Sequence, residues 1–327
     1  MSVLVTGGDG FVGQHLIAAL LAGGRRVSAT TVSTEPAAGT LDPDAFAAAR
    51  WYHVDVGDPA GLERTLAETD PAVVFHLAGF SSGAQARGRV DEALAVNAGG
   101  TLNLMSAAHA AGLRRPRFVI AGSADAYGGD DALIDESMPL RPRSLYGTTK
   151  AAQDVVARGA GRALGFDVRV ARLFPLIGPG QGAAFVLPSF CRRALRVARG
   201  EGEPRLRVGN LDVERDYTDV RDGVDALIRI SNLAPGPHHA YNVCSGRGTA
   251  VGQLLTWVLD AAGIEVEITV DPSLLRDGEP ERLAGDPKRL QEAAKWRVER
   301  DLRETVRETY RWVEATSGDL REPGEQA

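Results

Sequence analysis

Short apolar runs alternate with longer amphipathic stretches through the first half of the chain. The apolar runs have strand length and the stretches between them have helical spacing, which is typical of βαβ units in a parallel sheet covered on both faces. The predicted strands are Ser2–Thr6, Arg26–Thr31, Trp51–Val54, Ala72–Leu77, Arg117–Ala121 and Asp167–Arg172, and the predicted helices are Phe11–Ala22, Asp58–Glu68, Val90–Ala111 and Tyr146–Leu164. We therefore predict an α/β fold with a doubly wound parallel sheet, whose ligand crevice lies at the carboxyl ends of the strands.

The pattern loosens from about Pro175 into loops rich in proline and glycine, with a predicted helix at Pro188–Arg199 and a short strand at Leu206–Val208. This change indicates a smaller substrate domain interleaved with the first. The expected division is a dinucleotide-binding domain at 1–174, to which 212–245 returns, a substrate domain at 175–211 and 246–316, and a frayed polar tail at 317–327.

Composition and charge exclude several classes of protein. The chain has 327 residues and a formal net charge of −6, and it contains no basic run that would follow a phosphate backbone, so we expect no nucleic-acid partner. Its two cysteines, Cys191 and Cys244, form no CxxC pair, and we expect neither a disulfide nor a metal site. The chain opens directly on VLVTGG and has no run of 18 apolar residues, so we expect a cytoplasmic protein without a membrane partner.

A glycine-rich segment, TGGDGFVG, follows the first predicted strand and opens the first predicted helix. Gly7 permits a tight turn, Gly10 lets the backbone approach a pyrophosphate, and Gly13 lets the helix pack closely on the strand. Phe11 and Val12 belong to the helix start, where backbone N–H groups meet the anion. A purely structural turn is the alternative, but strand, turn and helix all stand in the order that a dinucleotide site requires.

The ends of the other strands supply further candidate cofactor contacts. Thr31 ends the second strand without an adjacent carboxylate to hold the ribose 2′-OH of NAD, and no arginine follows to clamp a 2′-phosphate. This favours NADP(H) over NAD(H), without excluding the latter. The remaining candidates follow the third, fourth and sixth strands: Asp55, Val56, Leu77, Ala78, Gly79 and Phe174. For Asp55, a turn or helix-cap role is the alternative.

Tyr146 and Lys150 stand four residues apart at the start of a predicted helix, so both project from one face. A nearby cation stabilises phenolate and lowers the tyrosine pKa, which suits the side chain to general acid–base catalysis. Such a pair is often only a solvated helix face. Ser123 favours the catalytic interpretation, because it ends the strand RFVIAGS beside the expected crevice and is placed to hydrogen-bond the same substrate oxygen.

The segments GxxGxxG, HLAG, SADAYG, YGTTK and RDYTDVRD together resemble the extended short-chain dehydrogenase/reductase family, over nearly the whole chain to about Trp312. The resemblance implies that Ser123, Tyr146 and Lys150 are catalytic and that Tyr146 and Lys150 also contact the cofactor. It further implies that Asn97, in VNAGGTLNL, uses its backbone to help hold a proton-relay water. An asparagine on a polar helix face is the alternative for Asn97.

Within that family, the stretches GPGQGAAFVLPSF, VGNLDVERDYTDVRD, YNVCSG and DPSLLRDGEPERLAGDPKRL are similar to GDP-mannose 4,6-dehydratases and especially to GDP-4-dehydro-6-deoxy-D-mannose reductases. That similarity implies that Phe185, Val186 and Val208 border the nucleotide. It also implies that Arg215, Arg276 and Glu279 hold phosphates and ribose, and arginine forks suit a diphosphate. Surface ion pairing is the alternative for these charged residues.

The end of the fifth predicted strand separates reductases from dehydratases. The resemblance implies Thr-Asp-Glu or Thr-Ser-Glu there in dehydratases, whereas this chain has Ser123, Ala124 and Asp125. Ala124 donates no proton, and Asp125, a further candidate catalytic residue, is one methylene shorter than glutamate. Another departure is Pro175, which stands where family members have asparagine and offers no amide.

The sequence thus predicts a nicotinamide-dependent oxidoreductase that reduces the C4 keto group of a nucleotide-linked 4-keto-6-deoxyhexose, with GDP as the favoured nucleotide. A 4,6-dehydratase or C4 epimerase that retains its NAD(P) is the enzymatic alternative. A cofactor-sensing protein without catalysis is the other alternative, and the complete Ser123, Tyr146 and Lys150 set disfavours it. The helices Val90–Ala111 and Tyr146–Leu164 match those that pair in family dimers, so we expect a homodimer.

Overall fold

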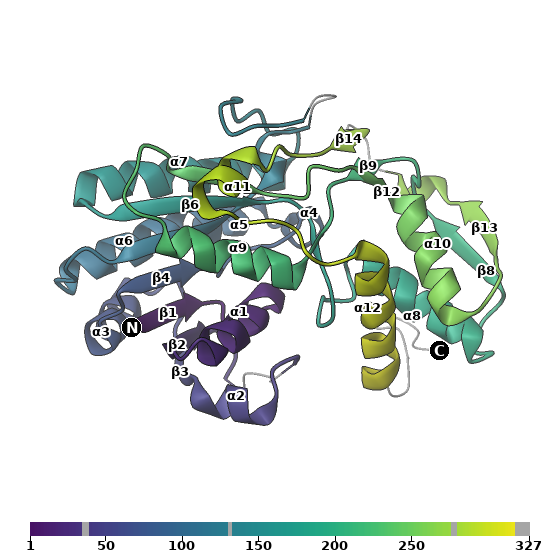
Figure 1. The fold of residues 1–327 in the computed structure, drawn as a ribbon, viewed down its shortest axis with the longest axis horizontal. Coiled ribbons are helices and arrows are strands. Elements are labelled where there is room, and N and C mark those ends of the chain that lie inside the picture. The colour runs from purple at the N-terminus through teal and green to yellow at the C-terminus, as the bar shows by residue number, and fades with distance from the viewer. Residues whose placement is uncertain (35–38, 130–132, 276–279, 318–327) are drawn as a thin grey trace.

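A seven-stranded parallel sheet forms the centre of the molecule (Figure 1), in the order β11-β6-β5-β4-β1-β2-β3. The computed structural model describes residues 1–34, 39–129, 133–275 and 280–317. The strands of this main sheet are β1 (Ser2–Thr6), β2 (Arg26–Thr31), β3 (Arg50–His53), β4 (Val73–His76), β5 (Arg117–Ser123), β6 (Asp167–Leu173) and β11 (Ala240–Val243). This is the doubly wound parallel sheet that the alternating pattern predicts.

Helices cover both faces of the main sheet. One face packs against α1 and α9 and shares their apolar core, whereas the other packs against α3, α6 and α7. The helices of this region are α1 (Phe11–Ala22), α2 (Pro43–Ala48), α3 (Pro59–Thr69), α4 (Gly83–Ala86), α5 (Val90–Leu94), α6 (Gly100–Ala110), α7 (Leu145–Leu164), α9 (Val220–Asn232) and α11 (Lys288–Ala294), with a 3₁₀ turn at Ala124–Ala126. Burial of both sheet faces explains why the central strands β1, β4 and β5 contain continuous apolar runs.

Local signals fix the ends of the helices that carry the site. Asp58 caps α3 by accepting from the N–H of Gly61, and Ser144 caps α7 by accepting from the N–H of Gly147. Helix α7 ends at Gly165, whose φ of 74° lies in the left-handed region. These caps set where α7 begins, and therefore where Tyr146 in its first turn lies.

A second region, drawn at the right of Figure 1, has its own apolar core. Its helices α8 (Val186–Ala198), α10 (Val251–Ala262) and α12 (Leu302–Thr316) pack on one another beside the parallel pair β8 and β13. The short strands outside the main sheet are β7 (Leu176–Ile177), β8 (Arg205–Val208), β9 (Glu214–Arg215), β10 (Thr218–Asp219), β12 (Thr249–Ala250), β13 (Glu267–Val270) and β14 (Arg282–Leu283), and a 3₁₀ turn lies at Pro272–Leu274. We call this assembly the second region.

The chain crosses between the two regions more often than the sequence indicates. Strand β11 and helix α9 lie with the main sheet, whereas Val213 and Tyr217, from the segment 212–245 that we expected to return to it, are buried in the core of the second region. We expected 246–316 to lie wholly in the substrate domain, but Leu290 and Trp296 are fully buried in the core of the main sheet. We therefore propose that the segment from α11 to about Trp296 belongs to the main sheet region, because its apolar side chains have their partners there.

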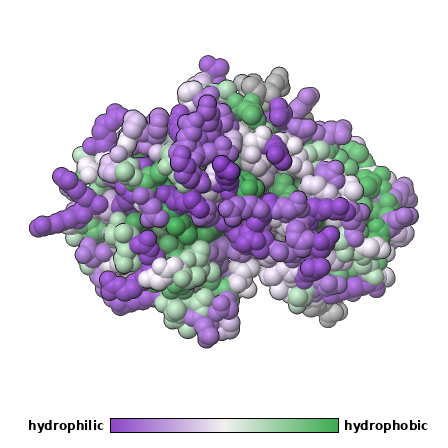
Figure 2. All heavy atoms as spheres, in the orientation of Figure 1, coloured by the Kyte–Doolittle hydropathy of each residue, from purple (hydrophilic) through white to green (hydrophobic). Residues whose placement is uncertain are grey.

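Element bounds agree well with the sequence pattern where apolar periodicity is strong: β1, β2 and α1 have the predicted limits. The predicted helix Val90–Ala111 is interrupted by a π-helical turn at Ala95–Gly99, which contains Asn97. None of the described helices is long and apolar enough to cross a membrane. On the face shown in Figure 2, hydrophilic side chains spread over both regions, with smaller hydrophobic areas between them.

Candidate active site

The candidate site lies at the carboxyl edge of the main sheet, where neighbouring strands end side by side. Strands β1, β4 and β5 are adjacent and parallel, so their last residues Thr6, His76 and Ser123 share this edge. The helix α1 starts just beyond β1, and α7 packs against β5 and β6 (Figure 1). Sequence-distant motifs are thereby brought to one place, as expected for a doubly wound sheet.

The glycine-rich turn is built so that no side chain fits its inner surface. Gly7 has a φ of 67°, and a Cβ there would lie 2.8 Å from the backbone nitrogen of Ala78. A Cβ at Gly13 would lie 2.7 Å from the carbonyl oxygen of Gly8. Gly10 is the N-cap of α1 and has no side chain to cap it. The first N–H groups of the helix, at Phe11 and Val12, therefore have no side-chain cap and are available to an anion, so the residues present fit a dinucleotide pyrophosphate.

A carboxylate lies at the end of β2, contrary to the sequence reasoning. The hydroxyl of Thr31 donates to Oδ2 of Asp9 at 2.6 Å, and the backbone N–H of Ser33 donates to the same hydroxyl at 2.9 Å. Asp9 comes from the glycine-rich turn rather than from β2, so the sequence of β2 alone gives no sign of it. No lysine or arginine occurs in residues 27–49. The ribose-reading position thus carries an acidic group.

The other predicted cofactor contacts differ in how they are exposed. Leu77 and Ala78 are half-buried and Gly79 is exposed at the end of β4. The carboxylate of Asp55 accepts from the N–H of Gly57 at 2.6 Å, which is the turn role that was the alternative for this residue. Val56 is buried, and a Cβ at Gly100 would lie 2.6 Å from its side chain. Phe174 is fully buried in a small core with Tyr127 and Cys244 rather than at the crevice surface.

Tyr146, Lys150 and Ser123 come together at the junction of α7 and β5. The close approach of the two elements depends on Gly147, because a Cβ there would collide with the carbonyl oxygen of Asp125. The Ser123 hydroxyl is hydrogen-bonded with the Tyr146 phenol, and it lies 3.4 Å from Oδ2 of Asp125. Tyr146 and Lys150 are each only 6% exposed. This geometry unites the three residues that the sequence singles out.

The electrostatics of Tyr146 differ from the sequence expectation. Burial raises the pKa of its phenol well above the ordinary value, and the charge of Asp125 raises it further, whereas the Ser123 hydrogen bond lowers it. Burial lowers the pKa of Lys150 to about 8. The Lys150 ammonium donates to the carbonyl of Ala121 at 2.8 Å and to Gln153 Oε1 at 2.6 Å. Because the phenol stays protonated at neutral pH, Tyr146 is suited to donate a proton rather than to accept one.

Asn97 is held in the π-helical turn and is fully buried, so it does not lie on a polar helix face. Its side-chain oxygen accepts from the N–H of Phe80 at 2.9 Å, and its amide donates to Thr149 Oγ1 at 2.9 Å. These two bonds tie the loop after β4 to α7. Asn97 therefore links the predicted cofactor loop to the helix that carries Tyr146 and Lys150.

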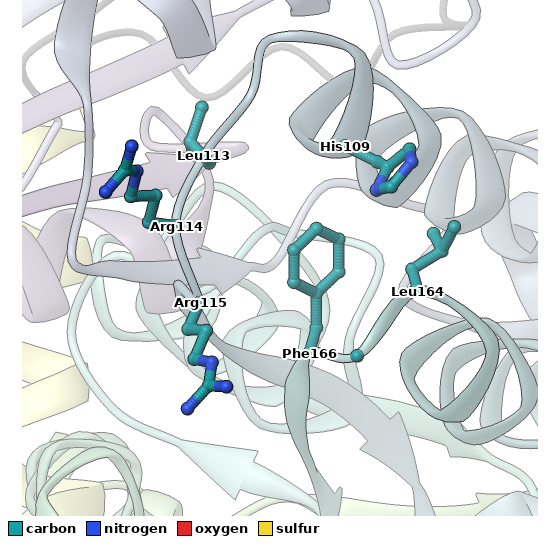
Figure 3. Close-up of a pocket in the computed structure, with 7 residues that line it drawn as sticks. His109, Leu113, Arg114, Arg115, Leu164 and Phe166 are labelled. Carbon is teal, nitrogen blue, oxygen red and sulfur yellow. The ribbon is translucent and has the colours of Figure 1, made fainter.

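A surface hollow elsewhere on the main sheet region is separate from this crevice (Figure 3). It is lined by His109, Leu113, Arg114, Arg115, Leu164, Gly165 and Phe166. These residues precede the first residues of β5 and β6, so the hollow lies at the amino edge of the sheet. It is thus at the opposite end of β5 from Ser123, and it shares no residue with the candidate active site.

The family model described as GDP-mannose 4,6 dehydratase matches residues 4–309. The chain belongs to this family. It is 35% identical to the GDP-6-deoxy-D-mannose reductase of Pseudomonas aeruginosa, over 93% of this chain and 94% of that protein. It is also 32% identical to a UDP-glucose 4-epimerase of Mycolicibacterium smegmatis, over 94% of this chain and 97% of that protein. The predicted membership of the extended short-chain dehydrogenases is confirmed.

Solved structures agree with the GDP-mannose 4,6-dehydratase family assignment. The structure of RMD from Pseudomonas aeruginosa complexed with NADPH superposes with a TM-score of 0.82 at 32% identity, covering 96% of this chain and 99% of that one. The UDP-glucose 4-epimerase of Thermus thermophilus in complex with NAD gives 0.84 at 28% identity, covering 97% of this chain and all of that one. The chain is therefore an NAD(P)-dependent enzyme, as predicted.

The substrate-side residues inferred from the family resemblance lie in the second region and at its border. Phe185 is the N-cap residue of α8 and Val186 begins that helix, and both are half-buried. Val208 is 1% exposed in the core of the second region, so packing accounts for its side chain. Arg215 donates to the carbonyls of Glu214 and Pro280, at 2.8 and 3.0 Å. Arg276 and Glu279 lie outside the described residues.

Pro175, which stands where the family resemblance implies asparagine, takes part in backbone pairing. Its carbonyl oxygen accepts from the N–H of Thr218 at 3.0 Å, next to the paired strands β7 and β10. Proline still offers a carbonyl there, although it provides neither an N–H nor a side-chain amide. The local strand pairing of this chain therefore needs no side-chain amide at this position.

Three buried polar residues around Lys150 were missed by the sequence reasoning. Gln153 lies one helical turn after Lys150, while Thr101 and His76 come from α6 and β4. All three are 1% exposed or less. The spacing of Gln153 from Lys150 was the available signal, because residues three apart share a helix face.

Proposed function

We propose that this chain reduces the C4 keto group of GDP-4-dehydro-6-deoxy-D-mannose to give GDP-D-rhamnose. The observation that carries the proposal is the buried, protonated Tyr146 beside Ser123, next to the non-ionisable Ala124. The 35% identity to a GDP-6-deoxy-D-mannose reductase supports the substrate. Hydride transfer needs one proton donor at the substrate oxygen, and this set of residues supplies one.

The roles of the residues follow from their positions. Ser123 would orient the carbonyl through its hydroxyl, and Tyr146 would protonate the C4 alkoxide as it forms. Lys150 would hold the nicotinamide ribose by its ammonium group. A bound reduced nicotinamide supplies the hydride. Because the groups are largely buried, their interactions with the developing charge are stronger than they would be in water.

We propose NADP(H) as the cofactor, with NAD(H) as the second candidate. The NADPH complex of the Pseudomonas aeruginosa relative and the lack of a carboxylate within β2 support NADP(H). The Asp9 carboxylate beside Thr31 favours NAD(H), because it would repel a 2′-phosphate and accept from a 2′-OH. Titration of the protein with each reduced cofactor, followed by fluorescence, separates the two.

A nucleotide-sugar 4,6-dehydratase or C4 epimerase is the second candidate function. Asp125 favours it, since its carboxylate lies close enough to Ser123 and Tyr146 to influence the tyrosine pKa. A dehydratase needs a further acid or base for elimination, and Ala124 supplies none. The reductase assignment therefore stands first.

We propose a cytoplasmic homodimer formed through α5, α6 and α7. Four large apolar side chains on these helices are exposed: Leu94 by 44%, Leu102 by 46%, Leu145 by 65% and Val155 by 59%. Burying them against a second copy would remove apolar surface from water. A cytoplasmic location is supported by the two cysteines, Cys191 and Cys244, which are both free thiols. Analytical ultracentrifugation of the wild type and of Val155→Glu tests the dimer, which the charge should dissociate.

The substrate class is tested by supplying 4-keto-6-deoxy sugars linked to GDP, UDP or dTDP, each with NADPH, and following the loss of NADPH absorbance. We expect the GDP-linked sugar to give the highest kcat/KM. A higher kcat/KM with a UDP- or dTDP-linked sugar would contradict the choice of nucleotide, while leaving ketoreduction in place.

A further inference from the structure

The ammonium of Lys150 has two fixed partners inside the protein. It donates to the carbonyl of Ala121 at 2.8 Å and to Oε1 of Gln153 at 2.6 Å. An ammonium has three N–H donors, so these two bonds leave one for a ligand in the crevice. Ala121 belongs to β5 and Gln153 to α7, and the pair therefore determines where the third N–H points.

The orientation of the Gln153 amide is fixed by its neighbours. Lysine is a donor only, so the amide oxygen must face Lys150, and the amide nitrogen then donates to Thr101 Oγ1 at 3.1 Å. Thr101 donates its one hydroxyl hydrogen to the carbonyl of Asn97 at 2.6 Å. The Thr101 oxygen therefore accepts from Gln153, and a flipped amide would place two donors against each other.

The same hydrogen-bond network continues from Thr101 to Thr6, the first residue of the glycine-rich segment. Because Thr101 has already donated its hydrogen, His76 Nε2 is the donor in the 3.0 Å contact between them. Burial lowers the His76 pKa to about 3, so the ring is neutral and its Nδ1 accepts from the Thr6 hydroxyl at 2.8 Å. Thr6 also accepts from the N–H of Ala78 at 3.3 Å. The four residues whose side chains form this network, Thr6, His76, Thr101 and Gln153, are each at most 1% exposed.

We propose that Gln153 is a positioning residue that holds Lys150 and connects it, through Thr101, to the carbonyl of Asn97. The family resemblance implies a water held at that carbonyl for the proton relay. Here the Thr101 hydroxyl occupies one acceptor site of the carbonyl, and the path from it to Lys150 runs through two side chains. An amide held at both ends fixes the ammonium in one place, whether or not a ligand is present.

The role of Gln153 rests on the proposed oxidoreductase function only in its kinetic consequence. The groups that interact with Lys150 are Asp125 after β5 and His76 on β4, besides its hydrogen-bond partners Ala121 and Gln153. Asp125 is the acidic group among them, and His76 is neutral. Gln153 is thus a polar, uncharged acceptor for the charged form of Lys150, and its loss should favour the neutral amine.

The test measures the Lys150 titration in cofactor-free protein, by the pH dependence of its acetylation relative to other lysines, read by peptide mass spectrometry. Gln153→Met keeps the side-chain length but removes both hydrogen bonds, and we expect the midpoint to fall by about one pH unit or more. Gln153→Glu should raise the midpoint by a similar amount, because a carboxylate would face the ammonium. Thr309→Val is the control, since it removes a buried hydroxyl in α12, remote from the crevice.

The kinetic arm follows NADPH oxidation against pH. Lys150 must be charged to hold the ribose, so activity should be lost as pH rises through its pKa, earlier in Gln153→Met and later in Gln153→Glu than in the wild type. If a Gln153 variant that folds has the wild-type midpoint both for Lys150 acetylation and for activity against pH, the proposal is overturned. An inactive wild type with shifted acetylation midpoints in the variants would instead remove the proposed function and leave the positioning role intact.

Discussion

The carboxyl edge of the main sheet and the second region use their polar residues in different ways. At the sheet edge, Tyr146, Ser123 and Lys150 contact one another or a shared network, and two of the three are almost fully buried. In the second region, Val208 is a core residue and Arg215 holds backbone carbonyls. The difference indicates that the polar groups are preorganised at the sheet edge, whereas the side proposed to meet the sugar nucleotide is shaped mainly by packing.

The largest effect on activity is expected from removing the proton donor at the sheet edge. Tyr146→Phe keeps the ring but loses the phenol, and it should lower kcat by about 10²-fold or more, with cofactor affinity almost unchanged. Steady-state kinetics with a cofactor titration check both halves of the prediction. Tyr310→Phe, in the core of the second region, is the matched control and should stay close to wild-type turnover. Wild-type kcat in Tyr146→Phe would remove this residue from the mechanism.

The second region is probed at its charged border. We propose that Arg215, besides holding backbone carbonyls, donates to the substrate diphosphate; Arg215→Met should then raise KM for the GDP-sugar by about tenfold or more and change kcat little, because that bond would be lost in both ground and transition states. Arg205→Met provides a control in the same region, since that side chain is exposed and pairs with Glu267. A fall in kcat at constant KM would mean that Arg215 contributes to the chemistry and that the two regions are not separated in this way.

The preference between NADPH and NADH tests the role of the polar residues at the end of β2. Asp9→Asn removes the negative charge beside Thr31, and the ratio of NADPH to NADH affinity should rise by about fivefold. Thr31→Asp should move the ratio in the other direction by adding a second carboxylate. Fluorescence titrations of both variants with each cofactor measure this ratio. Asp42→Asn is the control, because the Asp42 carboxylate caps α2. An unchanged ratio in Asp9→Asn would exclude Asp9 from 2′-phosphate discrimination.

The smallest effect is expected at Asp125. Asp125→Asn should reduce the ketoreductase kcat less than about threefold, since Tyr146 alone donates the proton. The substitution also removes the charge that raises the Lys150 pKa, so the alkaline limit set by that ammonium should move to lower pH. A loss as large as that of Tyr146→Phe would show that Asp125 takes part in proton transfer, which favours the dehydratase alternative.

Much of the fold and the catalytic set could be predicted from local sequence patterns. Strand and helix limits around β1, β2 and α1 were recovered because apolar runs and glycine-rich turns lie next to each other in the chain. Asp9 was missed because its relation to Thr31 depends on how the turn folds back over β2. The expectation of a lowered Tyr146 pKa was wrong, since four-residue spacing from Lys150 reveals neither the burial of the phenol nor the charge of Asp125 beside it. The placement of Trp296 in the main core likewise depends on long-range packing.

The central claim is that the buried Tyr146 serves reduction and not elimination, and stoichiometry tests it most directly. The protein is incubated with NADPH and either GDP-mannose or GDP-4-dehydro-6-deoxy-D-mannose, and NADPH absorbance is followed together with product formation. We expect no 4-keto product from GDP-mannose, and one NADPH oxidised for each molecule of the 4-keto sugar reduced. Formation of a 4-keto sugar from GDP-mannose without a change in NADPH absorbance would contradict the account and identify the protein as a dehydratase.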